Sequence, residues 1–330
     1  MFVSVLLGWC AMASVSLATY YSQEFAFDHF QAFMHKFDKR YSNVDEMMMR
    51  FEIFKKNLNL VNQMNNRSSG ATFGITQFTD LTPDEFRSMY TGLIVPEELA
   101  GSCVRKTDGD IPPVIAPESH DWRDRNIVTR VKDQKVCGSC WAFSAVGNIE
   151  SQYAFKHGNL QEFSEQQLVD CDTQSHGCSG GVMPFAFESV MEKGGIEGEQ
   201  DYPYIGFDEK CNFKADRVKA KVVGCSTYNI SDEIVLKQLL YKNGPLAIAV
   251  QAEAMQTYTG GIMTAETCNQ GGIDHGVLLV GYGVEGKKPY WIIKNSWGTK
   301  WGEDGYIRVE RNGGNPCNMR NEMMSSSVVE

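Results

Sequence analysis

One short run, Cys137-Gly-Ser-Cys140-Trp-Ala-Phe143, most constrains what this chain can fold into. After Cys140, apolar side chains recur at steps of three and four residues as far as Gly158, a spacing that predicts a helix with one buried face. These apolar positions are Phe143, Val146, Ile149 and Tyr153. Cys140 would therefore lie at a helix N-terminus, where the helix dipole favours a thiolate. A thiolate is a nucleophile, so Cys140 is a candidate for covalent catalysis.

Two motifs far downstream supply the partners that such a nucleophile needs. Asp274-His275-Gly276 offers an imidazole, and Lys294-Asn295-Ser296-Trp297-Gly298 offers an amide to orient it. Gln134 precedes Cys140 by six residues. With these four positions in this order, the sequence resembles the papain family of cysteine proteases over nearly its whole length. It looks most like the cathepsin L and F branch and the related viral cathepsins.

The resemblance implies a role for each of these residues. Cys140 would be the nucleophile, paired with His275 as thiolate and imidazolium. Asn295 would accept a hydrogen bond from the other ring nitrogen, and Trp297 would shield that bond from water. Gln134 and the backbone N–H of Cys140 would form the oxyanion hole. The family needs neither a metal nor a cofactor for this chemistry.

Substrate contacts are carried over in the same way. Gly180 and Gly181 match the strip along which an extended peptide lies, although a tight turn beside a disulfide would also explain glycines there. The pocket for the second residue before the scissile bond (P2) is mostly apolar, but Glu322 adds a carboxylate that would also accept arginine. An exposed C-terminal carboxylate is the alternative for Glu322. The residues expected to bind substrate are Gly180, Gly181, Val182, Met183, Ala249, Ile273, Gly276, Trp297 and Glu322.

The chain contains ten cysteines, and spacing alone does not fix their pairing. The resemblance implies three disulfides, Cys137–Cys178, Cys171–Cys211 and Cys268–Cys317. Cys225 is then left over, either as a buried inert thiol or paired with Cys103 while a precursor is intact. A zinc site at Cys171, His176 and Cys178 is a rival explanation, but two of its members are disulfide partners in the resembling family.

The N-terminal third divides into two segments. Residues 1–18 are apolar and end in small residues, which predicts a signal peptide, with a membrane anchor as the alternative. Residues 19–115 are predicted to be a helical inhibitory propeptide. Its positions Glu46, Arg50, Phe54, Asn57, Val61 and Asn65 match the propeptide motif of cathepsin L-like proteins. Within this helix Glu46 and Arg50 form an i,i+4 pair. An ordinary amphipathic helix with solvated charges is the alternative. Sequons make Asn66 and Asn229 candidate glycosylation sites.

Residues 116–330 are expected to form the peptidase domain. A capping box at Ser164 and Gln167 predicts a second helix in its first half. Short β-rich runs follow in the second half, at Leu246–Val250, Val277–Val280, Tyr290–Ile293 and Tyr306–Val309. The expected fold class is α+β, a papain-like fold with a helical lobe and an antiparallel β-barrel-like lobe, preceded by the helical propeptide. The site would lie in the cleft between the lobes.

Composition and charge limit the partners. A net charge of −10 with no basic stripe argues against nucleic-acid binding, and no later stretch is apolar enough to span a membrane. Protein substrates, the chain's own propeptide and cystatin-type inhibitors are the expected partners of a monomer. An acidic, lysosome-like compartment or the extracellular space is the expected location. The segment between Cys178 and Cys211 is as short as in the plain endopeptidases of the resembling family, which predicts an endopeptidase. Transglutaminase-type acyl transfer and a catalytically dead decoy are the rival functions.

Overall fold

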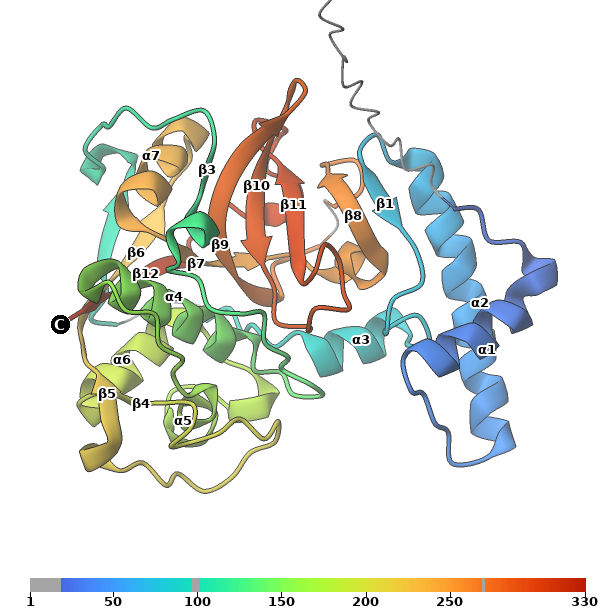
Figure 1. Ribbon diagram of the computed structural model, residues 1–330, viewed down its shortest axis with the longest axis horizontal. Coiled ribbons are helices and arrows are strands. Elements are labelled where there is room, and N and C mark those ends of the chain that lie inside the picture. The colour runs from blue at the N-terminus through green and yellow to red at the C-terminus, as the bar shows by residue number, and fades with distance from the viewer. Residues whose placement is uncertain (1–18, 97–100, 269–270) are drawn as a thin grey trace, which may run out of the picture.

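The computed structural model describes residues 19–96, 101–268 and 271–330, so the signal peptide predicted at residues 1–18 lies outside the described residues. Figure 1 shows a body of two lobes with the helices of an N-terminal arm (residues 19–96) at one side. The helices are α1 (Ala26–Lys36), α2 (Val44–Arg67), α3 (Pro83–Tyr90), α4 (Cys140–His157), α5 (Glu165–Cys171), α6 (Met183–Lys193) and α7 (Glu233–Asn243). None of the helices in the described ranges is long and apolar enough to cross a bilayer.

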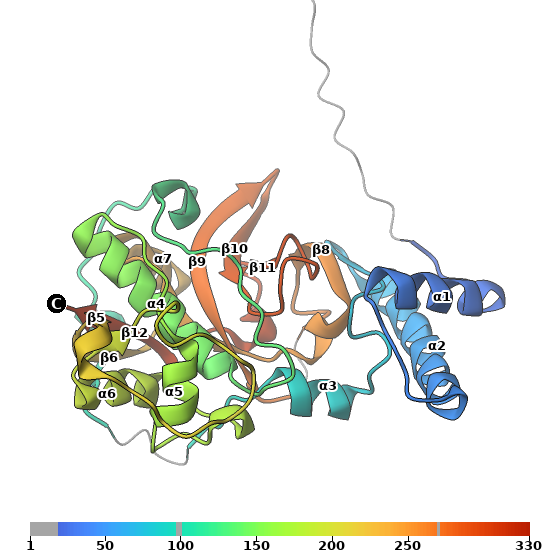
Figure 2. The same cartoon turned by 60° about the horizontal axis from the view of Figure 1, so that its bottom comes forward.

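The arm has its own aromatic core. Phe30 and Phe33 of α1 pack against Phe54 of α2, and all three side chains are fully buried or nearly so. Asn43 caps α2 by accepting a hydrogen bond from the Glu46 backbone N–H. In both Figure 1 and Figure 2, α3 lies between the α1–α2 pair and the body. The arm thus presents α3 and the chain after it to the body.

Contacts between α2 and the segment before α3 fix this arrangement. Arg50 pairs with Glu85 of α3 at 2.8 Å, and the Asn57 side chain donates to the backbone carbonyls of Thr79 and Leu81 at 2.8 Å each. Among the described residues Arg50 makes its ion pair with Glu85, while Glu46 bonds Ser42, so the i,i+4 pair of Glu46 and Arg50 is left with an attraction over a longer distance. These contacts give two of the propeptide-motif positions a tertiary role.

The helical lobe is built around α4. This helix begins at Cys140 and ends at Gly158, whose left-handed conformation closes it, so the predicted helix is confirmed. It is buried along most of its length and packs on α6 and on strands of the sheet. Ser164 caps α5 as predicted, but Gln167 does not complete the box, since its side chain bonds the backbone at Gly195 and Glu197 instead.

The strands are β1 (Ala71–Phe73), β2 (Val104–Thr107), β3 (His120–Asp121), β4 (Ile196–Glu197), β5 (Val218–Ala220), β6 (Val222–Asn229), β7 (Leu246–Val250), β8 (Tyr258–Met263), β9 (His275–Glu285), β10 (Lys288–Lys294), β11 (Tyr306–Glu310) and β12 (Met324–Val329). The main sheet has the order β1-β8-β11-β10-β9-β7-β12-β6-β2, with β3 added beside β9. The four β-rich runs predicted from the sequence correspond to β7, β9, β10 and β11.

The α+β fold with two lobes is confirmed, but the sheet differs from the expected antiparallel barrel-like lobe. Among the described strands the sheet is open, and two of its pairings, β8 with β11 and β2 with β6, are parallel. Its two end strands, β1 and β2, both precede the body in the chain. They cover the edges of β8 and β6 instead of meeting each other, so the sheet does not close.

Candidate active site

Cys140 is the first residue of α4 and lies where the two lobes meet. Its side chain is fully buried, and Gly276 of β9 faces it across the boundary. A Cβ at Gly276 would come within 3.1 Å of the Cys140 carbonyl oxygen, so a larger residue would push the lobes apart. Burial raises the pKa of the Cys140 thiol to about 12, although a hydrogen bond from the Gly276 backbone acts in the opposite direction.

His275 opens β9 and is held by residues of the chain after β10. Its Nε2 lies 2.8 Å from Asn295 Oδ1, an acceptor, so Nε2 carries the proton and donates it. Trp297 stacks on the imidazole at 4.6 Å between ring centroids and is itself 1% exposed. Nδ1 has no hydrogen-bond partner among the described residues. Burial lowers the pKa of His275 to about 4, so the ring is neutral in this arrangement.

Gln134 lies on the other side of the same site. Its Oε1 accepts from Ser296 at 2.7 Å, which fixes the amide so that Nε2 donates to the carbonyls of Cys137 and Tyr90. The Tyr90 carbonyl, at 3.2 Å from Gln134, also accepts from the Trp297 indole at 3.0 Å. A carbonyl oxygen of the arm is therefore already bound by the amide predicted to hold an oxyanion.

The arm runs through the site as an extended strand. The backbone N–H groups of Gly92 and Leu93 donate to the Asp274 carbonyl, at 3.1 and 3.0 Å. Gly181 donates to the Gly92 carbonyl and accepts from Ile94, at 2.9 and 3.0 Å, so Gly181 and Leu93 form a parallel bridge. At Gly180, a Cβ would lie 2.7 Å from the Gly92 carbonyl, so the chain passes this strip at close range.

Leu93 of the arm is part of the apolar core of the helical lobe. It belongs to the same buried cluster as Val182, Met183 and Ala249, with Ile273 packed beside them. The structure thus brings together most of the residues expected to form the P2 pocket. It also adds Met323, a buried member of this cluster that the sequence analysis missed.

Glu322 does not join this cluster. Its side chain is 56% exposed and accepts from Arg105 at 2.9 Å. It lines a neighbouring hollow together with Cys103 and Pro184. Sequence reasoning had no signal for Arg105, because that residue comes from the N-terminal third and reaches Glu322 only through the pairing of β2 with β6.

Four disulfides are present among the described residues. Three are the expected pairs, Cys137–Cys178, Cys171–Cys211 and Cys268–Cys317. The fourth joins Cys103 to Cys225, which selects the second of the two alternatives for Cys225. Cys140 is free. The rival zinc site at Cys171, His176 and Cys178 has no thiolates to offer, because its two cysteines belong to different disulfides.

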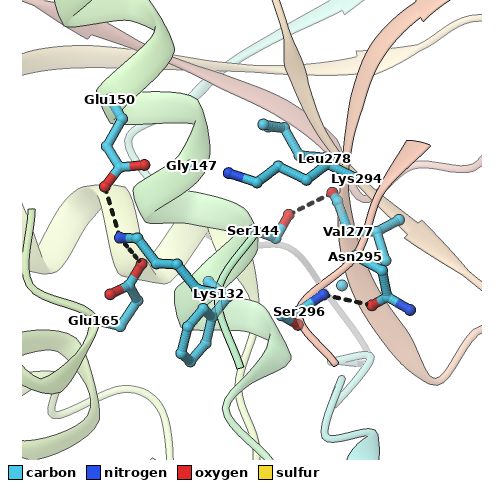
Figure 3. A pocket seen from close by; sticks show the side chains of 12 residues that line it. Lys132, Ser144, Gly147, Glu150, Glu165, Val277, Leu278, Lys294, Asn295 and Ser296 are labelled. Carbon is cyan, nitrogen blue, oxygen red and sulfur yellow. Dashed lines mark hydrogen bonds and ion pairs between the residues drawn. The ribbon is translucent and has the colours of Figure 1, made fainter. Parts of the chain in front are cut away.

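A buried group of charges lies behind the site (Figure 3). Lys132 bridges Glu150 of α4 and Glu165 of α5, at 2.7 and 2.5 Å. Lys294, next to Asn295 in the chain, donates to Thr129, which in turn donates to Glu150. Burial lowers the pKa of Lys294 to about 8. The sequence analysis missed this network, and a charged residue within the buried span of α4, Glu150, was the available signal.

Comparisons with known proteins match the arm and the body to two separate family models. Residues 116–327 match the model of the papain family cysteine proteases, and residues 30–86 match the cathepsin propeptide inhibitor domain (I29). A viral cathepsin of Spodoptera litura multicapsid nucleopolyhedrovirus is 42% identical over 97% of both chains. One from Orgyia pseudotsugata multicapsid polyhedrosis virus is 45% identical over 92% of both.

Solved precursor structures are similar over the same range. Digestive procathepsin L2 from Tenebrio molitor larval midgut superposes with a TM-score of 0.85 at 38% identity, covering 92% of this chain and 99% of that one. A recombinant stem bromelain precursor gives a TM-score of 0.79 at 35% identity, covering 92% and 99%. The arm and the body therefore both have counterparts in each of these two precursor structures.

Proposed function

The chain belongs to the papain family of cysteine proteases and is made as a zymogen with its own propeptide, and on this premise we propose an acid-active endopeptidase whose nucleophile is Cys140. One observation carries the assignment of residues. His275 is held by Asn295 beneath Trp297, and the next residue, Gly276, lies against Cys140, the free thiol at the N-terminus of α4. A nucleophile, a base and a group that orients the base are the minimum for acyl transfer.

The proposed reaction begins when the arm leaves and water enters the site. His275 takes the thiol proton at Nδ1, and the Cys140 sulfur attacks the carbonyl carbon of the substrate. The Gln134 amide and the Cys140 backbone N–H donate to the developing oxyanion, a role supported by the Tyr90 carbonyl that Gln134 already binds. Loss of one such donor costs about 3–4 kcal/mol in the transition state. His275 then protonates the leaving amine, and water hydrolyses the thioester.

For the substrate, we propose a preference for leucine, valine or phenylalanine at P2. Leu93 supports this choice, because this leucine of the arm is buried in the same apolar cluster as Val182, Met183 and Ala249. Arginine at P2 would require the Glu322 carboxylate, which Arg105 engages in the precursor. The short connection between Cys178 and Cys211 supports an endopeptidase over an exopeptidase.

Acid would loosen the arm through its carboxylates. Asp80 accepts from Lys39 at 2.9 Å and from Tyr41 at 3.0 Å, and Glu85 accepts from Arg50. Burial raises the pKa of Glu85, but hydrogen bonds from Thr82 and Arg50 outweigh it, so the net shift is downward. A depressed carboxyl pKa stabilises the fold of the arm above the ordinary value of about 4.3, and this contribution is lost as the pH falls through the lowered value.

The setting follows from the same features. Four disulfides support passage through an oxidising compartment, consistent with a signal peptide at residues 1–18 and delivery to a lysosome-like or extracellular space. Asn66 and Asn229 are both exposed, as glycan acceptors must be. Cystatin-type inhibitors and a monomeric state remain part of the proposal.

The test uses acid-treated protein and fluorogenic peptide amides with leucine or arginine at P2. Turnover by the wild type should fall at least about a thousandfold in Cys140→Ala, which keeps the pocket but removes the nucleophile. Equal turnover by the two proteins would contradict the proposed nucleophile.

Glu322→Ala should lower the ratio of turnover with arginine at P2 to turnover with leucine at P2, and an unchanged ratio would remove Glu322 from the pocket. At pH 4–5, purified Cys140→Ala should stay unprocessed, whereas identical processing of both proteins would exclude self-activation.

A further inference from the structure

A short segment after the arm (residues 101–112, the tail segment) is built into the peptidase body. It lies between the two ranges that match family models, which end at residue 86 and begin at residue 116. Its strand β2 pairs in parallel with β6, from Val104 beside Ser226 to Thr107 beside Asn229. Figure 1 shows this strand at the opposite side of the molecule from α1 and α2. The tail segment is therefore remote from the arm that fills the cleft.

The tail segment is also covalently attached. Cys103 forms a disulfide with Cys225, which lies in the middle of β6 and is 3% exposed. By contrast, no described residue of the arm shares a disulfide with the body. Packing and hydrogen bonds of its described residues hold the arm on the body, and the chain joins the arm to the tail segment.

Polar contacts hold the tail segment at both ends. At its start, Ser102 donates from its backbone and side chain to Glu188 of α6. Further along, Asp108 accepts from the backbone N–H groups of Ser231 and Asp232, each at 3.1 Å, and from the Ser231 hydroxyl at 2.7 Å. Asp232 is the N-cap of α7, so the tail segment takes part in the start of a body helix.

This attachment changes what activation requires. A single cut near Ile115, before the peptidase domain, would leave the arm joined to the body through Cys103 and Cys225. A tethered arm keeps a high effective concentration and would remain in the cleft. We propose that residues 101–112 are a permanent part of the active peptidase, and that the cut that frees the cleft lies N-terminal to Cys103.

Two consequences follow for the active form. Strand β2 stays on β6 and continues to cover an edge that would otherwise expose unpaired backbone groups. Arg105 stays beside Glu322, so the tail segment influences any role of that carboxylate in substrate choice. This proposal rests on the part of the proposed function that has the propeptide removed on activation, and it does not depend on which residues are catalytic.

The first experiment tests the tether without relying on activity. A recognition sequence for a sequence-specific protease is inserted after Ile115, whose side chain is 99% exposed, in a Cys140→Ala chain. After the cut, the fragment that ends at Ile115 should stay with the body in denaturant and separate only after reduction. Separation without reductant would overturn the proposal. Because no turnover is measured, failure of the proposed function would leave this result intact.

The matched control is the double variant Cys103→Ser, Cys225→Ala, which keeps the pairing of β2 with β6 but removes the disulfide. Its cut fragment should separate in denaturant without reductant. If this variant does not fold, the cut parent chain measured with and without reductant still decides the question.

The second experiment measures the mass of the self-processed wild-type enzyme after its thiols are alkylated without reduction. The mass should include residues 101–112. An active enzyme that lacks them and carries an alkylated Cys225 would overturn the proposal.

Discussion

At the scale of single residues, the arm controls the protonation of the site as well as access to it. With the arm in place, burial lowers the pKa of His275 to about 4 and raises that of Cys140 to about 12. The precursor therefore favours a neutral thiol and a neutral imidazole, not the ion pair that the resemblance implies for an open enzyme. Phe78 and Phe86 of the arm contact the edge of the Trp297 indole, which seals the histidine from that side.

This leads to a prediction for His275. In a Cys140→Ala precursor, NMR titration of the His275 ring should give a pKa of about 4, and removal of the arm should move it towards the ordinary value of about 6.5. The closed state favours the neutral ring, so arm binding should be strongest above about pH 6.5. It should weaken as the pH falls and level off near pH 4, by at most about 3 kcal/mol. A ring that titrates near 6.5 with the arm bound would contradict the proposed sealing.

At the scale of elements, predictions from the sequence held where one short segment carried the signal. The start and end of α4 and the strand β7 follow from local spacing and caps. Contacts with a partner from a distant segment were not predicted. Arg50 bonds Glu85 and not Glu46, and the serine-rich strand β12 is fixed by Asn148, which accepts from the backbone and hydroxyl of Ser327. Periodicity within a segment carries no information about such partners.

The extended strand of the arm gives a prediction at this scale. A Cβ at Gly92 would lie 2.1 Å from the Gly138 carbonyl oxygen, so Gly92→Ala should expel the strand from the cleft. The unprocessed variant should hydrolyse a leucine-containing peptide amide at least about tenfold faster than the unprocessed wild type, a loss of about 1.4 kcal/mol or more in inhibition.

Gly109→Ala is the matched control, because a Cβ there has no atom within 4 Å. It should leave the precursor as silent as the wild type. If Gly92→Ala were equally silent, the strand would not be the element that blocks the cleft.

At the scale of the whole molecule, the buried charges connect segments that are distant in the chain. Lys132 joins Glu150 of α4 to Glu165 of α5 (Figure 3). Lys294 of the sheet bonds Thr129, and Thr129 bonds Glu150. The network therefore crosses between the lobes directly behind Asn295. No motif in the sequence predicts it, because its members become neighbours only when both lobes have folded and packed together.

Lys132 is the centre of this network, and Lys132→Met tests it. The substitution keeps an unbranched side chain that is one atom shorter, but it leaves Glu150 and Glu165 buried without their cation, so unfolding in urea at pH 7 should become easier by about 3–5 kcal/mol. Burial already raises the pKa of Glu165, and loss of Lys132 raises it further. Because the pKa of Glu165 is higher in the folded state, the destabilisation builds up as the pH rises above the ordinary carboxyl value of about 4.3. The penalty should therefore shrink as the pH falls from 7 to 5. Lys300→Met at an exposed position is the control and should change stability by no more than about 0.5 kcal/mol. Both substitutions are made in a Cys140→Ala chain. A Lys132→Met penalty that is equal at both pH values would show that lost packing, and not unpaired charge, is what the lysine prevents.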